Sequence, residues 1–163
     1  MFIKLSLLIV LSFHFVQAAQ GQTASIRPEV LRLTEAMTLD STLDVKPVGR
    51  APRATPAYHR FVQLGELATM SELSALTSHP KPIVRSAAFL HLVRTAQPVD
   101  ILPLLAKHTQ DTVAFTLRGG CITSSNWVGH FMYLYTRQTW KKRQLLAQNE
   151  RRLDKISDEL LRP

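Results

Sequence analysis

Apolar residues recur at intervals of three and four positions through most of the chain beyond its first third, which is the spacing of helices that bury one face each. The clearest unit is 72–96, where two such stretches flank the His-Pro-Lys-Pro sequence at 79–82. Thr69 and Glu72 have the spacing of a capping box, so the first helix is expected to begin near Met70. The prolines end that helix because they lack a backbone donor, and the second proline can open the next helix. This stretch therefore predicts a helix–turn–helix unit.

The second predicted helix carries one stripe of buried positions. Their spacing is i, i+3, i+4, i+7 and i+8, and they are Val84, Ala87, Ala88, His91 and Leu92. The small side chains at 87 and 88 allow a neighbouring helix to approach closely. We therefore expect the two helices to fold back on each other as antiparallel rods.

These residues resemble a HEAT repeat, the two-helix unit of the α-solenoid families. The resemblance rests on the Leu-x-x-Leu of the first helix, the proline-containing turn, and Val84, Arg85, Ala88 and Leu92. It implies that Val84 is a core residue and that Arg85 bonds to the turn or to a neighbouring repeat. More loosely, the rest of the chain is similar to small secreted bacterial proteins with one HEAT-like repeat, in the Gly-Cys-Ile sequence at 120–122 and the Val-Gly pair at 128–129. A fold of this kind does not identify an activity.

Further helices are predicted on both sides of the central unit. They are expected over 57–67, 99–107, 112–118, 126–137 and 141–161, with Gly119-Gly120 ending the third and Thr123, Ser124 or Ser125 capping the fourth. Gly129 costs a helix about 1 kcal/mol relative to alanine, so a close helix approach is expected there. The predicted fold class is all-α: a short HEAT-like helical-hairpin solenoid with a C-terminal capping helix and a mostly extended N-terminal segment.

The C-terminal helix has a heptad-like seam made of Leu146, Asn149, Leu153, Ile156 and Leu160. We favour a capping role, because a solenoid needs its apolar edge covered and the seam is short. The alternative is self-association through the seam, with Asn149 setting the register.

The N-terminal part differs in composition from the rest of the chain. Residues 1–18 combine Lys4 with an apolar run and a small-residue cleavage site, which predicts a signal peptide cut after Ala18 or, alternatively, after Gly21. The run is shorter than the roughly 20 residues that a membrane anchor needs. Residues 19–56 are expected to be a flexible segment and linker, containing a short helix within 25–37, and 57–163 the HEAT-like domain. The product is expected to be exported, to a periplasm or out of the cell, with no membrane anchor after cleavage.

The net charge of +8 favours acidic partners through long-range attraction. The expected partner is another protein, and an acidic protein would match this charge. Anionic polysaccharide or lipid headgroups would fit the same charge. Nucleic acid is not expected outside the cytoplasm. The simpler explanation of the charge is a solvated surface, since lysine and arginine are spread along the chain.

The predicted role is a non-enzymatic interaction or scaffold module. Its proposed contact face is the exposed side of the second helix, through Arg85, Phe89, His91 and Arg94, of which His91 belongs mainly to the packed side. No metal site and no cofactor are predicted, because no histidines form a close pair at ligand spacing and no phosphate loop is present.

The single cysteine, Cys121, has two interpretations. We favour a small buried side chain beside the Gly119-Gly120 bend. The alternative is an enzyme or enzyme-accessory protein in which Cys121 is a nucleophile and His130 or His108 its base. No recognisable protease signature surrounds the cysteine.

Overall fold

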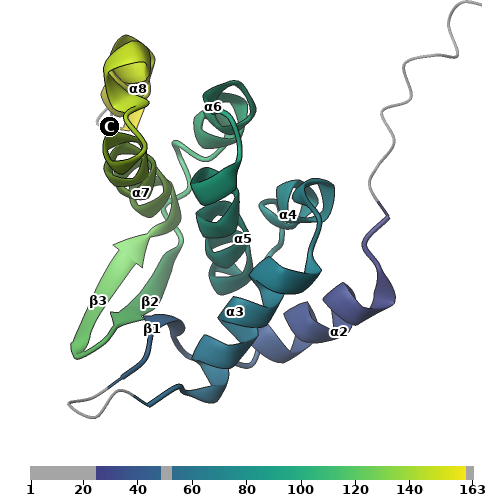
Figure 1. Cartoon of the computed structure of the whole chain (residues 1–163). Helices are drawn as coiled ribbons and strands as arrows, with labels where there is room; N and C mark the ends of the chain where they lie inside the picture. The colour runs from purple at the N-terminus through teal and green to yellow at the C-terminus, as the bar shows by residue number, and fades with distance from the viewer. Residues whose placement is uncertain (1–24, 49–52, 161–163) are drawn as a thin grey trace, which may run out of the picture.

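The computed structural model describes residues 25–48 and 53–160. The predicted signal peptide and both cleavage positions lie outside these residues. The described residues form seven helices and three strands. In chain order they are α2 (Pro28–Met37), β1 (Leu43–Lys46), α3 (Pro56–Leu67), α4 (Met70–Leu76), α5 (Pro82–Thr95), α6 (Pro98–Lys107), β2 (Ala114–Gly119), β3 (Ile122–Trp127), α7 (Val128–Lys142) and α8 (Leu146–Leu160) (Figure 1).

The all-α prediction is wrong, because the chain contains a three-stranded mixed sheet and has an α/β fold. The strand order is β1-β2-β3; β1 pairs with β2 in parallel, with Leu43 opposite Leu117, and β2 pairs with β3 in antiparallel orientation. The helix expected over 112–118 is replaced by β2. The residues at 123–125, expected to cap a helix, lie inside β3.

A tight hairpin turn explains why this region forms strands. Gly119 pairs with Ile122, which leaves only Gly120 and Cys121 in the loop. Gly120 has φ +70°, and positive φ at the first of two loop residues fits a type II′ turn, whose twist matches that of antiparallel strands. On β2, Phe115 is buried and packs edge-on against Phe131 of α7, with ring centroids 5.0 Å apart. The glycine pair therefore joins two strands and does not end a helix.

The central helical unit is confirmed as a pair of helices. Both capping-box bonds are present at Thr69 and Glu72, α4 begins at Met70, and α5 opens with Pro82. However, α5 is buried on nearly all sides from Ile83 to Leu90, because it contacts α2, α3, α4, α7 and β2 (Figure 1). It is the central helix of a layered core, whereas a solenoid helix would bury one stripe.

The N-terminal segment is expected to be mostly extended and flexible, whereas its described part forms α2 and β1 and belongs to the same core. Val30 and Met37 of α2 and Leu43 of β1 are buried with the residues of α5. Asp44 of β1 is fully buried and bonded by Arg118 of β2, at 2.9 and 2.5 Å. Strand pairing across more than 70 residues therefore ties this segment to the rest of the fold.

The last two helices meet at a different place from that predicted. α7 continues to Lys142, and α8 begins at Leu146 and not near 141. Leu153 and Ile156 of the seam are buried, and α8 contacts α6 and α7 of the same chain. These seam residues thus pack against α6 and α7 of the same chain, which is not the edge of a solenoid.

Candidate functional site

The four residues of the predicted contact face do not form one exposed surface. Phe89 is fully buried, and Arg85 is 6% exposed. The Arg85 guanidinium donates to both carboxylate oxygens of Asp111, at 2.7 and 2.9 Å, and to the carbonyl of Pro80 at 2.8 Å. The last of these is the bond to the turn that the resemblance implied for Arg85. Phe89 and Arg85 are therefore buried structural residues and cannot belong to an exposed contact face.

His91 and Arg94 both contact the Phe61 ring. The His91 ring stacks on Phe61 at a centroid distance of 4.4 Å, and its Nε2 bonds the Phe61 carbonyl at 2.9 Å. Burial lowers the pKa of His91, and Arg94 lowers it further, while the bond to Phe61 acts in the opposite direction. The Arg94 guanidinium lies 5.4 Å from the centroid of the Phe61 ring and is otherwise exposed. Of the four predicted residues, Arg94 alone is exposed, and this packing holds it in place.

Arg94 lines a hollow that we call the basic pocket. Its volume is about 290 Å³, and it lies where β1 and the last turn of α5 meet α7; its lining residues are Val45, Lys46, Arg94, Tyr135, Gln138, Thr139 and Lys142. The four residues from α7 are spaced i, i+3, i+4 and i+7, so they share one helix face. The remaining three come from elements far away in the sequence.

The charge of the basic pocket is uniformly positive. Lys46, Arg94 and Lys142 line it without any carboxylate, and across residues 25–48 and 53–160 none of the three cations forms an ion pair. A positive side chain in the last turn of a helix interacts favourably with the helix dipole, which explains the positions of Arg94 on α5 and Lys142 on α7. Lys46 comes from a strand and has no such explanation. Positive charges gathered in a hollow attract anions more strongly than the same charges spread over a flat surface.

Tyr135, Gln138 and Thr139 add neutral hydrogen-bonding groups to the basic pocket. Burial raises the pKa of the Tyr135 phenol, and Arg94 offsets this only in part. Tyr135 therefore stays protonated at neutral pH and can donate its O–H. With the amide of Gln138 and the hydroxyl of Thr139, the pocket has donors that suit the oxygen atoms of a carboxylate.

A second hollow, the α7–α8 groove, adjoins the basic pocket and shares Tyr135 and Gln138 with it. Its volume is about 670 Å³, and its other lining residues are Leu134, Arg137, Lys141, Leu146 and Glu150. Leu134 is 45% exposed there, and Arg137 and Glu150 approach to 3.7 Å at the edge. Apolar surface thus lies directly beside the positive pocket.

The structure does not bring Cys121 together with either predicted base. Cys121 is exposed at the β2–β3 turn, so the expectation that it is buried is wrong. His130 lies beyond the far end of β3, a strand of six residues that spans about 20 Å at roughly 3.3 Å per residue. His108 is at that same far end, since its backbone packs on Gly129. In the described residues, no three histidine, cysteine, aspartate or glutamate side chains are placed to share a metal ion.

Sequence reasoning missed most of the basic pocket. The helical spacing on α7 and the run of basic residues from 137 to 143 were visible signals, but the contributions of Lys46 and Arg94 depend on how β1 and α5 pack. Within the part of the chain that the structure describes, no helix has both the length and the apolar character to cross a bilayer. No family model, curated protein or solved structure matches this chain.

Proposed function

We propose that this chain is an exported, non-enzymatic binding module that holds an acidic segment of a partner protein in the basic pocket. The observation that carries the proposal is the convergence of Lys46, Arg94 and Lys142 on one hollow without a carboxylate. The net charge, +8 for the full sequence and +7 once Lys4 leaves with the signal peptide, adds long-range attraction for the same partner. Export rests on residues 1–18 of the sequence.

The α7–α8 groove favours a protein over other anions. Its exposed Leu134 and its neighbour Leu146 suit an apolar side chain next to an acidic one, a combination that peptides offer and polysaccharides do not. A lipid surface would suit cations spread over a flat face, whereas these cations line a hollow. We therefore assign the acidic group to the basic pocket and a neighbouring apolar group to the groove.

A fluorescent peptide that alternates glutamate and leucine tests the proposal, with a glutamine-for-glutamate version for comparison. We expect the acidic peptide to bind and its affinity to fall with salt. The double variant Lys46→Gln/Lys142→Gln should bind it roughly tenfold more weakly, since each lost charge contact contributes up to about 1 kcal/mol. Fluorescence anisotropy measures the affinity, and circular dichroism confirms that the variant is folded.

The matched control is Arg151→Gln/Lys155→Gln, which removes the same charge from exposed positions on α8. It should change affinity less than about twofold at physiological salt, where distant charges are screened. Equal weakening by both double variants would mean that the chain attracts anions only through its overall charge. Tighter binding to anionic vesicles than to the peptide would instead assign the basic pocket to a membrane surface.

A further inference from the structure

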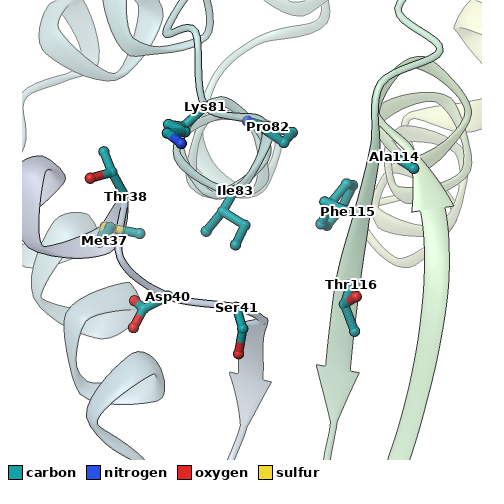
Figure 2. A pocket seen from close by; sticks show the side chains of 10 residues that line it. All are labelled: Met37, Thr38, Asp40, Ser41, Lys81, Pro82, Ile83, Ala114, Phe115 and Thr116. Atoms are coloured by element: carbon teal, nitrogen blue, oxygen red, sulfur yellow. The ribbon is translucent and has the colours of Figure 1, made fainter.

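A third hollow lies between the end of α2, the start of α5 and strand β2 (Figure 2). We call it the α2–α5 pocket. Its volume is about 320 Å³, and its lining residues are Met37, Thr38, Asp40, Ser41, Lys81, Pro82, Ile83, Ala114, Phe115 and Thr116. It shares no lining residue with the basic pocket.

The inner wall of the α2–α5 pocket is apolar. Met37, Ile83 and Phe115 are all buried core residues. Figure 2 shows the Ile83 side chain extending from α5 into the space between α2 and β2, with Phe115 on the β2 side. The cavity is at the small end of the range for ligand sites, about 300–1,000 Å³. This wall suits a short aliphatic or aromatic body.

The polar groups of the α2–α5 pocket leave a net positive charge. The Asp40 carboxylate is neutralised by Arg60, whose Nε donates to it at 2.9 Å and whose Nη2 makes a second contact. Lys81 has no ion-pair partner among residues 25–48 and 53–160. Thr38, Ser41 and Thr116 supply hydroxyls. Lys81 is therefore the one lining charge in the described pocket that is left for a ligand.

We infer that the α2–α5 pocket binds a small monocarboxylic acid with an apolar body, its carboxylate at Lys81 and its body against Ile83 and Phe115. The start of α5 strengthens this arrangement, because no side chain caps it and its backbone amides carry partial positive charge. A cation of the same shape would meet Lys81 and the helix start with repulsion. The pocket thus selects for the sign of the charge as well as for apolar surface.

Three probes of equal chain length test this inference: hexanoate, hexanol and hexylamine, each titrated into the isotopically labelled chain and followed by backbone amide NMR. Hexanoate should shift the amides of Ile83, Phe115 and Thr116 and bind most tightly, hexanol more weakly, and hexylamine least. Lys81→Gln should weaken hexanoate about fivefold and leave hexanol unchanged, as expected for one lost charge contact. The control Lys155→Gln removes an exposed charge on α8 and should leave all three probes unchanged.

A second variant tests the cavity itself. Ile83→Phe enlarges the side chain that extends from α5 into the cavity (Figure 2), so it fills space that the apolar part of the ligand would occupy. It should weaken the binding of hexanoate and of hexanol together while the amide spectrum stays dispersed. Equal binding of hexanoate to Ile83→Phe and to the parent protein, or amide shifts confined to the basic pocket, would overturn the inference. Because Ile83 does not line the basic pocket, Ile83→Phe should still bind the acidic peptide, so failure of one site is distinguishable from failure of the other.

Discussion

Gly129, the second residue of α7, packs against the backbone of the segment that follows α6. A Cβ atom at this position would lie 2.3 Å from the carbonyl oxygen of His108 and 3.0 Å from that of Thr109. The Gly129 N–H also donates to the Asp111 carbonyl at 2.9 Å. The predicted close approach at this glycine is confirmed, although the partner is the backbone after α6 and not a helix face. Backbone atoms held by neighbouring bonds cannot move aside as a flexible side chain would.

Gly129→Ala should therefore destabilise the protein by about 1–3 kcal/mol or more, through overpacking against the backbone. Helix propensity alone gives the opposite sign, a gain of about 1 kcal/mol. Urea unfolding followed by circular dichroism measures the difference. Gly119→Ala is the control: its Cβ would meet only Val45 Cγ2 at 3.8 Å, an ordinary contact, so the free energy of unfolding should change little. A neutral or stabilising Gly129→Ala would contradict this reading.

Gly65 is a comparable position that the sequence did not reveal. A Cβ atom there would lie 2.4 Å from the His91 ring, which stacks on Phe61. Its role depends on a side chain 26 positions away, so only the folded structure identifies it.

At the scale of elements, the junction between α7 and α8 is a tight Schellman-type turn. The Leu145 N–H donates to the Trp140 carbonyl at 2.8 Å, and the Gln144 N–H to that of Lys141 at 3.3 Å. Gln144 has φ +58°, a left-handed conformation that glycine usually occupies at this position. The predicted boundary was wrong because no glycine or proline marks it in the sequence. Tertiary packing of α8 on α6 and α7 imposes the turn.

Gln144→Gly should stabilise the protein by up to about 1 kcal/mol, because glycine adopts positive φ without steric cost. Gln144→Ala keeps the Cβ atom and should stay close to the parent protein. Thermal unfolding of the three proteins in parallel measures the effect. A loss of stability in the glycine variant would show that the Gln144 side chain contributes more than its strained backbone costs.

The β2–β3 hairpin shows why a short element can be misassigned. Over 112–118, periodicity alone does not separate a two-turn helix from a strand, since the window is too short. The deciding signals were the β-branched and aromatic residues Val113, Phe115 and Thr116, followed by a glycine at the first position of a two-residue loop. The local sequence of β1, however, contains nothing that predicts its pairing with β2.

At the scale of the whole molecule, buried charges join segments that are distant in sequence. Burial raises the pKa of Asp44, but hydrogen bonds from Arg118, Thr55 and Thr42 outweigh burial and hold that pKa below its usual range. Its contacts connect β1 to β2 and, through Thr55, to the start of α3. Arg27 and the capping box similarly lower the pKa of Glu72. These carboxylates stabilise the fold above the unfolded-state pKa of about 4 and lose that contribution as the pH falls.

Two histidines, His108 buried and His91 half-buried, should make the fold sensitive to milder acid. Burial lowers the pKa of His91 and of His108; Arg94 lowers the first further, and Asp111 partly offsets the second. Below the unfolded-state pKa of about 6.5, the unfolded chain binds protons that the native imidazoles do not. The free energy of unfolding should therefore be lower at pH 5.5 than at pH 7.5, as measured in urea at both values.

His91→Gln should reduce this pH dependence, because glutamine can donate to the Phe61 carbonyl but does not titrate. His59→Gln, which removes an exposed imidazole, is the control and should keep the pH dependence of the parent protein. If His91→Gln keeps the full dependence between these pH values, the effect arises at other groups.

The sequence by itself determined the capping box at Thr69 and Glu72 and the opening of α5 at Pro82, because the groups involved lie within a few positions of one another. It also indicated a close approach at Gly129, because glycine inside a helix has a local cost that only packing can offset, but it did not identify the partner, which is the backbone at His108 and Thr109. Tertiary structure alone decided the pairing of β1 with β2, the burial of α5 on nearly all sides, and the meeting of Lys46, Arg94 and Lys142 around one hollow. Those features depend on which distant segments lie next to each other, and that choice is made by the packing of the whole core.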